Sequence, residues 1–169
     1  MTTPERKLNI ATAPSRYAKK WKNQSVTWDR FTERLQTPAV SDDKDQGGYV
    51  AGYLRDGERR GGRAERRSMI TLDVDYPSPI FELLLDTVLG SNAYALHETH
   101  SSTDDEPRYR LLVPLSGDLG SEEYTPATLK LMEHLGLEHF DPTTAQAERL
   151  IYWPVRKRKA GYEFRKNPG

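Results

Sequence analysis

Hydrophobic residues recur at two different periods along this chain, and the two periods predict helices and strands. Trp28, Phe31 and Leu35 fall on one face at helical spacing, and Thr27 stands where an N-cap is expected, so residues 27–35 are predicted to form a helix. Further helices are predicted over residues 80–89 and 125–137. Strands are predicted near residues 8–10 and over residues 49–54, 68–75, 93–99, 108–115 and 150–153.

The spacing of the predicted elements indicates the fold class. Segments 93–99 and 108–115 are joined by a short turn and must pair antiparallel, because a parallel crossover needs a dozen or more residues. The order strand–helix–strand–strand–helix–strand over residues 68–153 predicts one sheet with helices packed on it. The predicted class is therefore α+β, with an RRM-like or ferredoxin-like core, rather than a doubly wound parallel sheet.

Length and composition exclude several classes of protein. The 169 residues predict one domain, and no apolar run approaches the roughly 20 residues of a membrane span. The opening residues lack the apolar stretch of a signal peptide. The absence of cysteine excludes disulfides, cysteine zinc sites, iron–sulfur clusters and thiol catalysis, and an intracellular protein fits this composition.

The charge is balanced overall, with 25 basic and 25 acidic residues, but it is unevenly distributed. Residues 1–67 carry 15 basic and 9 acidic side chains, residues 68–155 carry 4 and 15, and residues 156–169 carry 6 and 1. An acidic middle between basic ends suits a site that holds metal ions beside a polyanion track. Solvated faces that differ in sign by chance are the alternative explanation.

Two carboxylates stand together at the end of the clearest predicted strand. Asp73 and Asp75 are two residues apart and therefore point to the same face, while Leu72 and Val74 point into the core. A divalent cation such as Mg²⁺ or Mn²⁺ would relieve the repulsion between them. The alternative is a solvated strand end.

A second polar group lies at the predicted hairpin. His100, Ser101 and Ser102 end one strand, and Arg108 and Arg110 open the next on one face, so these groups suit a triphosphate. Turn chemistry, with the arginines paired to nearby acids, is the alternative.

Other polar residues have less specific patterns. Asp141 is either the N-cap of a helix over residues 143–148 or a third carboxylate of the metal site, with Arg149 just beyond it. His97 and His100 are expected on opposite sides of a strand, which argues against a shared zinc ion. No Walker loop, Rossmann glycine pattern or Gly-x-Ser-x-Gly elbow occurs.

Taken in order, these motifs resemble the archaeo-eukaryotic primase superfamily, most of all the primase-polymerase domains of phage and plasmid replication proteins. The resemblance covers about residues 8–160. It is carried by the Asp-x-Asp strand (TLDVDY, 71–76), the strand–turn–strand (99–115), the single Asp before a final strand (FDPTTAQAERLIYWPV, 140–155) and the upstream segments 26–35 and 44–60.

The resemblance implies roles for individual residues. Asp73, Asp75 and Asp141 would ligate two Mg²⁺ or Mn²⁺ ions. Arg110 stands where many relatives have a histidine, which is a departure from the family pattern. The implied nucleotide-binding residues are Lys44, His100, Ser101, Ser102, Arg108 and Arg110. The basic stretches would track the template backbone through Arg59, Arg60, Arg63, Arg66, Arg67, Arg156, Lys157 and Arg158.

The implied fold is the superfamily's catalytic fold, an RRM-like sheet with flanking helices plus an N-terminal α/β unit. The implied activity is that of a DNA primase/polymerase in the bacterial host cytoplasm, which transfers nucleotides from (d)NTPs on a single-stranded DNA template. We expect residues 1–169 to be one catalytic domain, the N-terminal fragment of a larger replication protein that also carries a helicase. The alternatives are an HUH-like replication initiator or relaxase and a non-catalytic nucleic-acid-binding module.

Overall fold

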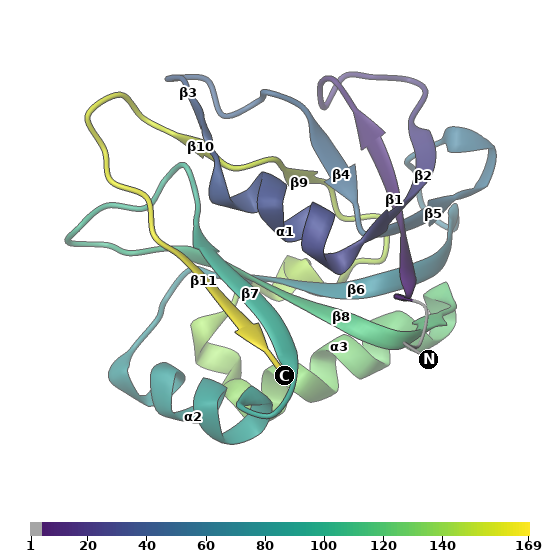
Figure 1. Cartoon of the computed structure of the whole chain (residues 1–169). Helices are drawn as coiled ribbons and strands as arrows, with labels where there is room; N and C mark the ends of the chain where they lie inside the picture. Colours follow the sequence, from purple (N-terminus) through teal and green to yellow (C-terminus); the bar gives the residue numbers. More distant parts are fainter. Residues whose placement is uncertain (1–4) are drawn as a thin grey trace.

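A five-stranded sheet runs through the middle of the computed structural model, which describes residues 5–169 (Figure 1). Its strand order is β11-β7-β8-β6-β5, and every neighbouring pair is antiparallel. The strands are β5 (Gly52–Leu54), β6 (Ala64–Val74), β7 (Ala93–Glu98), β8 (Tyr109–Leu119) and β11 (Phe164–Pro168).

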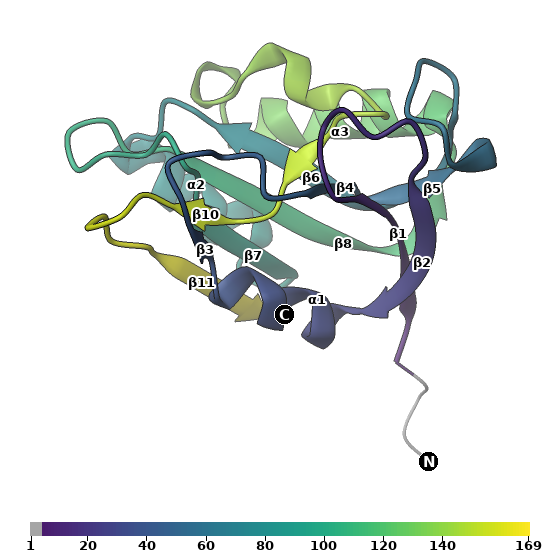
Figure 2. The same ribbon diagram turned by 90° about the horizontal axis from the view of Figure 1, so that it is seen from above.

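A four-stranded sheet of order β2-β1-β4-β9 lies over one end of this central sheet (Figure 2). A short parallel pair, β3 with β10, continues beside it. These strands are β1 (Lys7–Ala13), β2 (Lys22–Thr27), β3 (Ala39–Val40), β4 (Gly48–Val50), β9 (Ile151–Tyr152) and β10 (Val155–Arg156).

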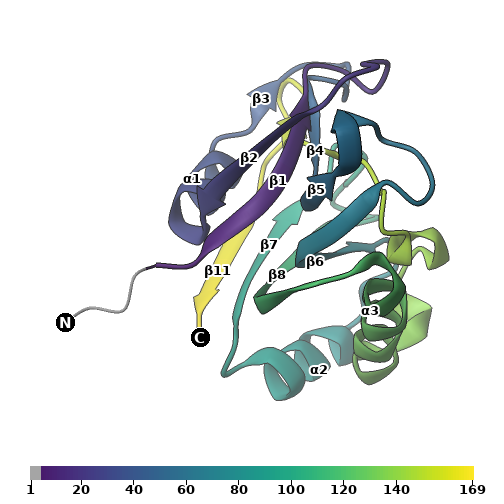
Figure 3. The same ribbon diagram turned by 90° about the vertical axis from the view of Figure 1, so that its right-hand side faces the viewer.

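The helices cover both faces of the five-stranded sheet. Helices α2 (Pro79–Leu89) and α3 (Ser121–Leu135) lie against one face, and α1 (Trp28–Gln36) lies with the four-stranded sheet against the other (Figure 3). The α+β class and the antiparallel pairing of β7 with β8 are therefore confirmed.

The alternation of side chains along β6 divides the core and fixes which residues face the site. Ile70, Leu72 and Val74 belong to the buried cluster that contains α2 and α3, whereas Met69 belongs to the cluster under α1. Because successive strand residues point to opposite faces, Asp73 points with Met69 toward the four-stranded sheet. Val74 and Leu72 are fully buried, as the sequence predicted.

Local capping explains the helix boundaries. The hydroxyl oxygen of Thr27 accepts a hydrogen bond from the backbone N–H of Arg30 at the start of α1. Ser78 caps α2, Pro79 occupies its first turn, and Gly90 follows its last residue. The predicted helices over residues 27–35 and 80–89 are therefore confirmed, while α3 begins four residues earlier than predicted.

The predicted strand over residues 49–54 is wrong in one respect, because it is two strands in different sheets. β4 pairs with β1 and β9, the chain crosses over at Ala51, and β5 pairs with β6. A Cβ atom on Gly52 would lie 2.0 Å from the carbonyl oxygen of Arg66, so only glycine permits this close crossing.

The end of the chain also differs from the prediction of one sheet over residues 68–153. The late strand at Ile151–Tyr152 joins the four-stranded sheet through β4 rather than the central sheet. Residues 164–168, inside the predicted basic tail, form the edge strand β11 and pair with β7. Such long-range pairings leave no local signal in the sequence.

One buried arginine connects these parts. Arg67 is fully buried, and its guanidinium donates hydrogen bonds to the carbonyl oxygens of Ala51, Ala147 and Met69 and to the hydroxyl of Thr71. All of these acceptors are neutral, and burial lowers the pKa of Arg67. The prediction that Arg67 contacts DNA is therefore wrong, because the guanidinium is inside the protein.

We expect Arg67→Leu to lower the free energy of unfolding by about 3 kcal/mol, because buried carbonyl groups lose their donor. The matched control is Arg66→Leu at the exposed neighbouring position, where the change should stay within about 0.5 kcal/mol. Chemical denaturation of both variants measures the difference. Equal stability of the two variants would contradict the role given to Arg67.

Candidate active site

Three adjacent strands place Asp73, Arg110 and His97 in one row. Asp73 of β6 pairs in register with Arg110 of β8, and Arg110 pairs with His97 of β7. Residues in register across a sheet share a face, so all three side chains point toward the four-stranded sheet. The row thus brings a carboxylate, a guanidinium and an imidazole together.

A loop that follows α3 brings Asp141 to the end of β6. The backbone N–H of Asp141 donates to the carbonyl oxygen of Asp73 at 3.1 Å, and Val74 bridges to Phe140. The Thr144 hydroxyl accepts from the backbone N–H of Asp73 at 2.9 Å and donates to the carbonyl oxygen of Thr71. These hydrogen bonds satisfy the backbone groups at the end of β6, and they place Asp141 beside Asp73.

Asp141 also caps a short 3₁₀ turn at Pro142–Ala145, so its N-cap role is confirmed, but the helix predicted over residues 143–148 is wrong because the turn ends at Ala145. One of its carboxylate oxygens accepts hydrogen bonds from the backbone N–H and the hydroxyl of Thr143. The other is 3.1 Å from Arg149. Burial raises the pKa of Asp141, but the Thr143 hydrogen bonds and Arg149 outweigh it, so the pKa lies below its ordinary value.

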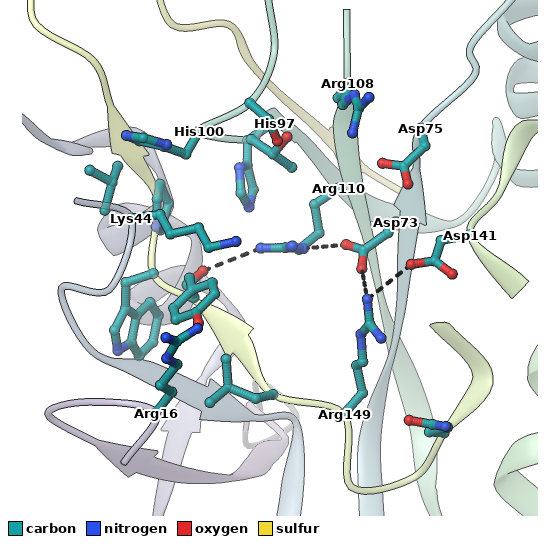
Figure 4. A pocket seen from close by; sticks show the side chains of 18 of the residues that line it. Arg16, Lys44, Asp73, Asp75, His97, His100, Arg108, Arg110, Asp141 and Arg149 are labelled. Atoms are coloured by element: carbon teal, nitrogen blue, oxygen red, sulfur yellow. Dashed lines mark hydrogen bonds and ion pairs between the residues drawn. The ribbon is translucent and has the colours of Figure 1, made fainter. Parts of the chain in front are cut away.

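Both carboxylate oxygens of Asp73 are held by arginines. Arg110 Nε lies 2.8 Å from one oxygen, and an amino group of Arg149 lies 3.0 Å from the other (Figure 4). Asp73 is 7% exposed, so burial raises its pKa, but the two guanidiniums outweigh this effect and the pKa falls below its usual range. Asp73 therefore remains ionised at neutral pH.

The pKa of Asp75, unlike that of Asp73, lies above its ordinary value. Burial raises its pKa first, and the negative charges of Asp73 and Asp141 raise it further. Within residues 5–169, no three His, Asp or Glu side chains are arranged so that they could hold a metal ion. The metal-ligand roles of Asp73, Asp75 and Asp141 accordingly stay a prediction.

The three carboxylates line one wall of a cavity of about 440 Å³ (Figure 4). Lys44 and Arg16 lie on the opposite side, and Arg110 lies between the two walls. Of the predicted nucleotide-binding and DNA-binding residues, those that line this cavity are Lys44, Arg59, His100, Ser101, Arg108 and Arg110.

The remaining predicted residues lie elsewhere. The Ser102 hydroxyl donates to Glu98 and accepts from the backbone N–H of Arg108, so it organises the turn outside the cavity lining. Arg60 pairs with Glu58, and Arg63 pairs with Asp56. Arg66 lies over the ring of Tyr53, Arg156 ends β10, and Lys157 and Arg158 are exposed beyond it.

The cavity lining includes residues that are not among the predicted site residues. Arg16, Gln146 and Tyr152 belong to its lining, and Arg149 links two of its carboxylates. His97 and His100 were expected on opposite sides of a strand, but both line this cavity because β7 ends at Glu98 and the chain then turns. The feature of the sequence that could have indicated a binding role for Arg16 is the run of basic residues at 16–20.

His97 is a buried neutral base at the floor of the site. Its Nδ1 lies 2.8 Å from the carbonyl oxygen of Glu98, and its Nε2 has no hydrogen-bond partner. Burial and the nearby charge of Arg110 lower the pKa of His97 to about 3. Asp73 opposes this shift, and the ring of Tyr162 packs 6.1 Å away.

We expect the stability of the protein to fall as the pH is lowered from 6.5 toward 4, partly because of His97. Below pH 6.5 the unfolded chain binds a proton at this imidazole, whereas the folded protein does so only near pH 3. Denaturation at several pH values should show a contribution of up to about 1.4 kcal/mol per pH unit. His97→Gln should have a shallower slope, and an unchanged slope would contradict the assignment.

Comparison with solved structures identifies the fold. The chain is similar to the AEP domain of the cyanophage S-2L primase-polymerase, with 13% sequence identity, a TM-score of 0.53, and coverage of 96% of this chain and 82% of that chain. The resemblance to archaeo-eukaryotic primases inferred from the motifs is thus confirmed at the level of the fold.

The family assignment is independent of that fold match. Residues 39–168 match the model of the VapE N-terminal domain, and the chain belongs to this family. A comparison with curated proteins found no match. None of the helices within residues 5–169 has both the length and the apolar character needed to cross a membrane.

Proposed function

We propose that this chain is a template-directed nucleotidyltransferase, a DNA primase/polymerase that acts on single-stranded DNA in phage or plasmid replication. The observation that carries the proposal is the cavity in which Asp73, Asp75 and Asp141 face a basic wall. Three carboxylates opposite cationic side chains suit a substrate that brings both phosphates and divalent cations. The fold and the family support this activity.

The chemistry of the donors fits Mg²⁺ or Mn²⁺, because both ions prefer carboxylate oxygens. Asp75 carries a raised pKa beside two other carboxylates, and a cation would relieve that repulsion. The Arg149 guanidinium lies between Asp73 and Asp141, so it has to turn away before Asp73, Asp75 and Asp141 can hold an ion together. Bound divalent ions would activate the attacking 3′-hydroxyl and stabilise charge on the transferring phosphorus.

The cationic side chains would hold the triphosphate. Arg110 is fixed by Asp73 and by the carbonyl oxygen of Tyr152 at 3.3 Å, so its guanidinium is oriented before substrate arrives. Arg108, His100 and Lys44 line the same cavity and add donors. Ser101 also lines the cavity, where its hydroxyl would reach a phosphate oxygen.

Arg149 would exchange partners during binding. In this structure it satisfies Asp73 and Asp141, and its other amino group donates to the Thr143 hydroxyl at 2.7 Å. A guanidinium released from two carboxylates is free to pair with phosphate oxygens. The arriving substrate would thus bring the cation for the carboxylates and the anion for Arg149.

The template strand would follow the basic surface next to the cavity, beginning at Arg59 and Arg60. A replicative helicase in the same polypeptide is part of this proposal. The second candidate is a non-catalytic nucleic-acid-binding module, and the observation that favours it is the pairing of both Asp73 oxygens with arginines.

Primer extension tests the proposal. On a primed single-stranded template with Mg²⁺ or Mn²⁺, Asp75→Asn should lower the extension rate roughly 100-fold or more, because one charge that stabilises the transition state is lost. The control is Asp104→Asn, which changes an exposed carboxylate outside the cavity lining and should keep full activity. Failure of the unaltered chain to extend with either ion, while it still binds template, would favour the binding module.

Manganese binding tests the partner exchange of Arg149. Arg149→Gln should tighten Mn²⁺ binding in the absence of nucleotide about tenfold or more, because a positive charge a few ångströms away opposes the ion by about 1 to 4 kcal/mol. Titration followed by electron paramagnetic resonance measures the dissociation constant. Lys130→Gln, which removes an exposed charge on α3 outside the cavity lining, is the control. Equal affinities for both variants would contradict the exchange.

A further inference from the structure

A second basic hollow adjoins the cavity and lies mostly outside the segment that matches the family. Its volume is about 290 Å³, and it is lined by Arg16, Ala18, Lys19, Trp21, Glu58, Arg59 and Arg60. Arg16 and Arg59 also line the cavity of the candidate site, so the two depressions meet at these side chains. We refer to these two adjoining depressions together as the trench.

The outer wall of this trench is the β1–β2 loop, residues 14–21, which precedes the matched residues 39–168. The loop is anchored at both ends. The backbone N–H of Arg16 donates to the carboxylate of Asp45, and the backbone N–H of Trp21 donates to the carbonyl oxygen of Gly57 at 2.8 Å. Figure 3 shows this loop beside the segment that follows β5.

One aromatic ring on this loop is open to solvent. Tyr17 is 74% exposed, whereas the ring of Trp21 is buried at the base of the loop. The Arg16 guanidinium lies over the Tyr17 ring, 4.6 Å from its centre, and also donates to its hydroxyl. A flat ring with a guanidinium on one face and solvent on the other offers a stacking surface for a base.

The charges that line the second hollow suit a phosphate backbone, and Tyr17 lies in the chain between two of its lining residues, Arg16 and Ala18. Arg16, Lys19, Arg59 and Arg60 line the second hollow against one acidic side chain, Glu58. Glu58 forms ion pairs with Arg60 and Lys20, so its negative charge is neutralised. The net charge of the lining is therefore positive. Exposed aromatics between cations are the arrangement by which proteins bind single strands without reading the sequence.

We propose that the β1–β2 loop binds the single-stranded template where it leaves the cavity, with Tyr17 stacked on a base and with Arg16 and Lys19 on the phosphates. This inference deepens the proposed function, on which it rests, because it gives the strand a path from the carboxylates through Arg16 and Arg59 to the loop. It assigns a role to residues that precede the family match.

Binding of a fluorescently labelled 20-nucleotide oligothymidylate, followed by anisotropy without nucleotides or metal, tests the loop. Tyr17→Leu should weaken binding about tenfold, whereas Tyr17→Phe, which keeps the ring, should bind like the unaltered chain. Lys19→Gln should lower the slope of the salt dependence by about 0.7, the amount expected for one phosphate contact on a single strand. Lys130→Gln, an exposed lysine on α3, is the matched control and should change nothing.

The outcomes separate this inference from the proposed function. Equal binding by Tyr17→Leu and the unaltered chain, absence of oligothymidylate binding, or tighter binding of a duplex of the same length would each overturn the loop assignment. Loss of extension in Asp75→Asn would still support the nucleotidyltransferase. Conversely, Tyr17-dependent binding by a chain that never extends a primer would support the loop and overturn the catalytic proposal.

Discussion

The hydrogen bonds of one buried guanidinium hold the two sheets and the site together. Arg67 contacts the carbonyl oxygen of Ala51, where the chain crosses between sheets, and that of Ala147, in the loop that carries Asp141 and Arg149. Moving a charge out of water costs several kcal/mol, and four neutral acceptors plus the Tyr124 ring, 4.0 Å away, offset this cost. Because the acceptors come from separate segments, Arg67 adds to the hydrogen bonds of Asp141 and Thr144 that hold their loop against β6.

That placement creates a site in which acidic and basic groups neutralise one another. Asp73 needs Arg110 and Arg149 to remain charged in a buried position, and Arg149 also satisfies Asp141. Asp75 is left with the repulsion of its neighbours. In the proposed function, a ligand that supplies both phosphates and cations would replace these internal ion pairs. No buried charge would then be left without a partner.

The basic surface beside this site differs from it in exposure, because Arg16, Lys19, Arg59 and Arg60 are exposed to solvent. Arg16 and Arg59 belong both to the cavity and to the hollow under the β1–β2 loop. Binding there would depend on salt, whereas the pairs at Asp73 are shielded from it by burial. The two proposals follow from this difference in exposure: nucleotidyl transfer at the buried carboxylates, and binding of the strand along the exposed basic residues.

The local pattern of residues was sufficient to predict the helix at Trp28–Gln36, the strand that carries Asp73, and the antiparallel hairpin. The grouping of Asp141 with Asp73 and Asp75 was implied only by the resemblance to archaeo-eukaryotic primases, and the structure places all three in the lining of one cavity. Helical spacing, capping residues and strand alternation are properties of neighbouring residues, so they can be read without the fold. The burial of Arg67, the division of residues 49–54 between two sheets, and the position of Arg149 between two carboxylates could be seen only in the folded chain. These features depend on contacts between segments far apart in the chain, and a basic residue has the same local pattern whether it meets solvent, carbonyl groups or a carboxylate.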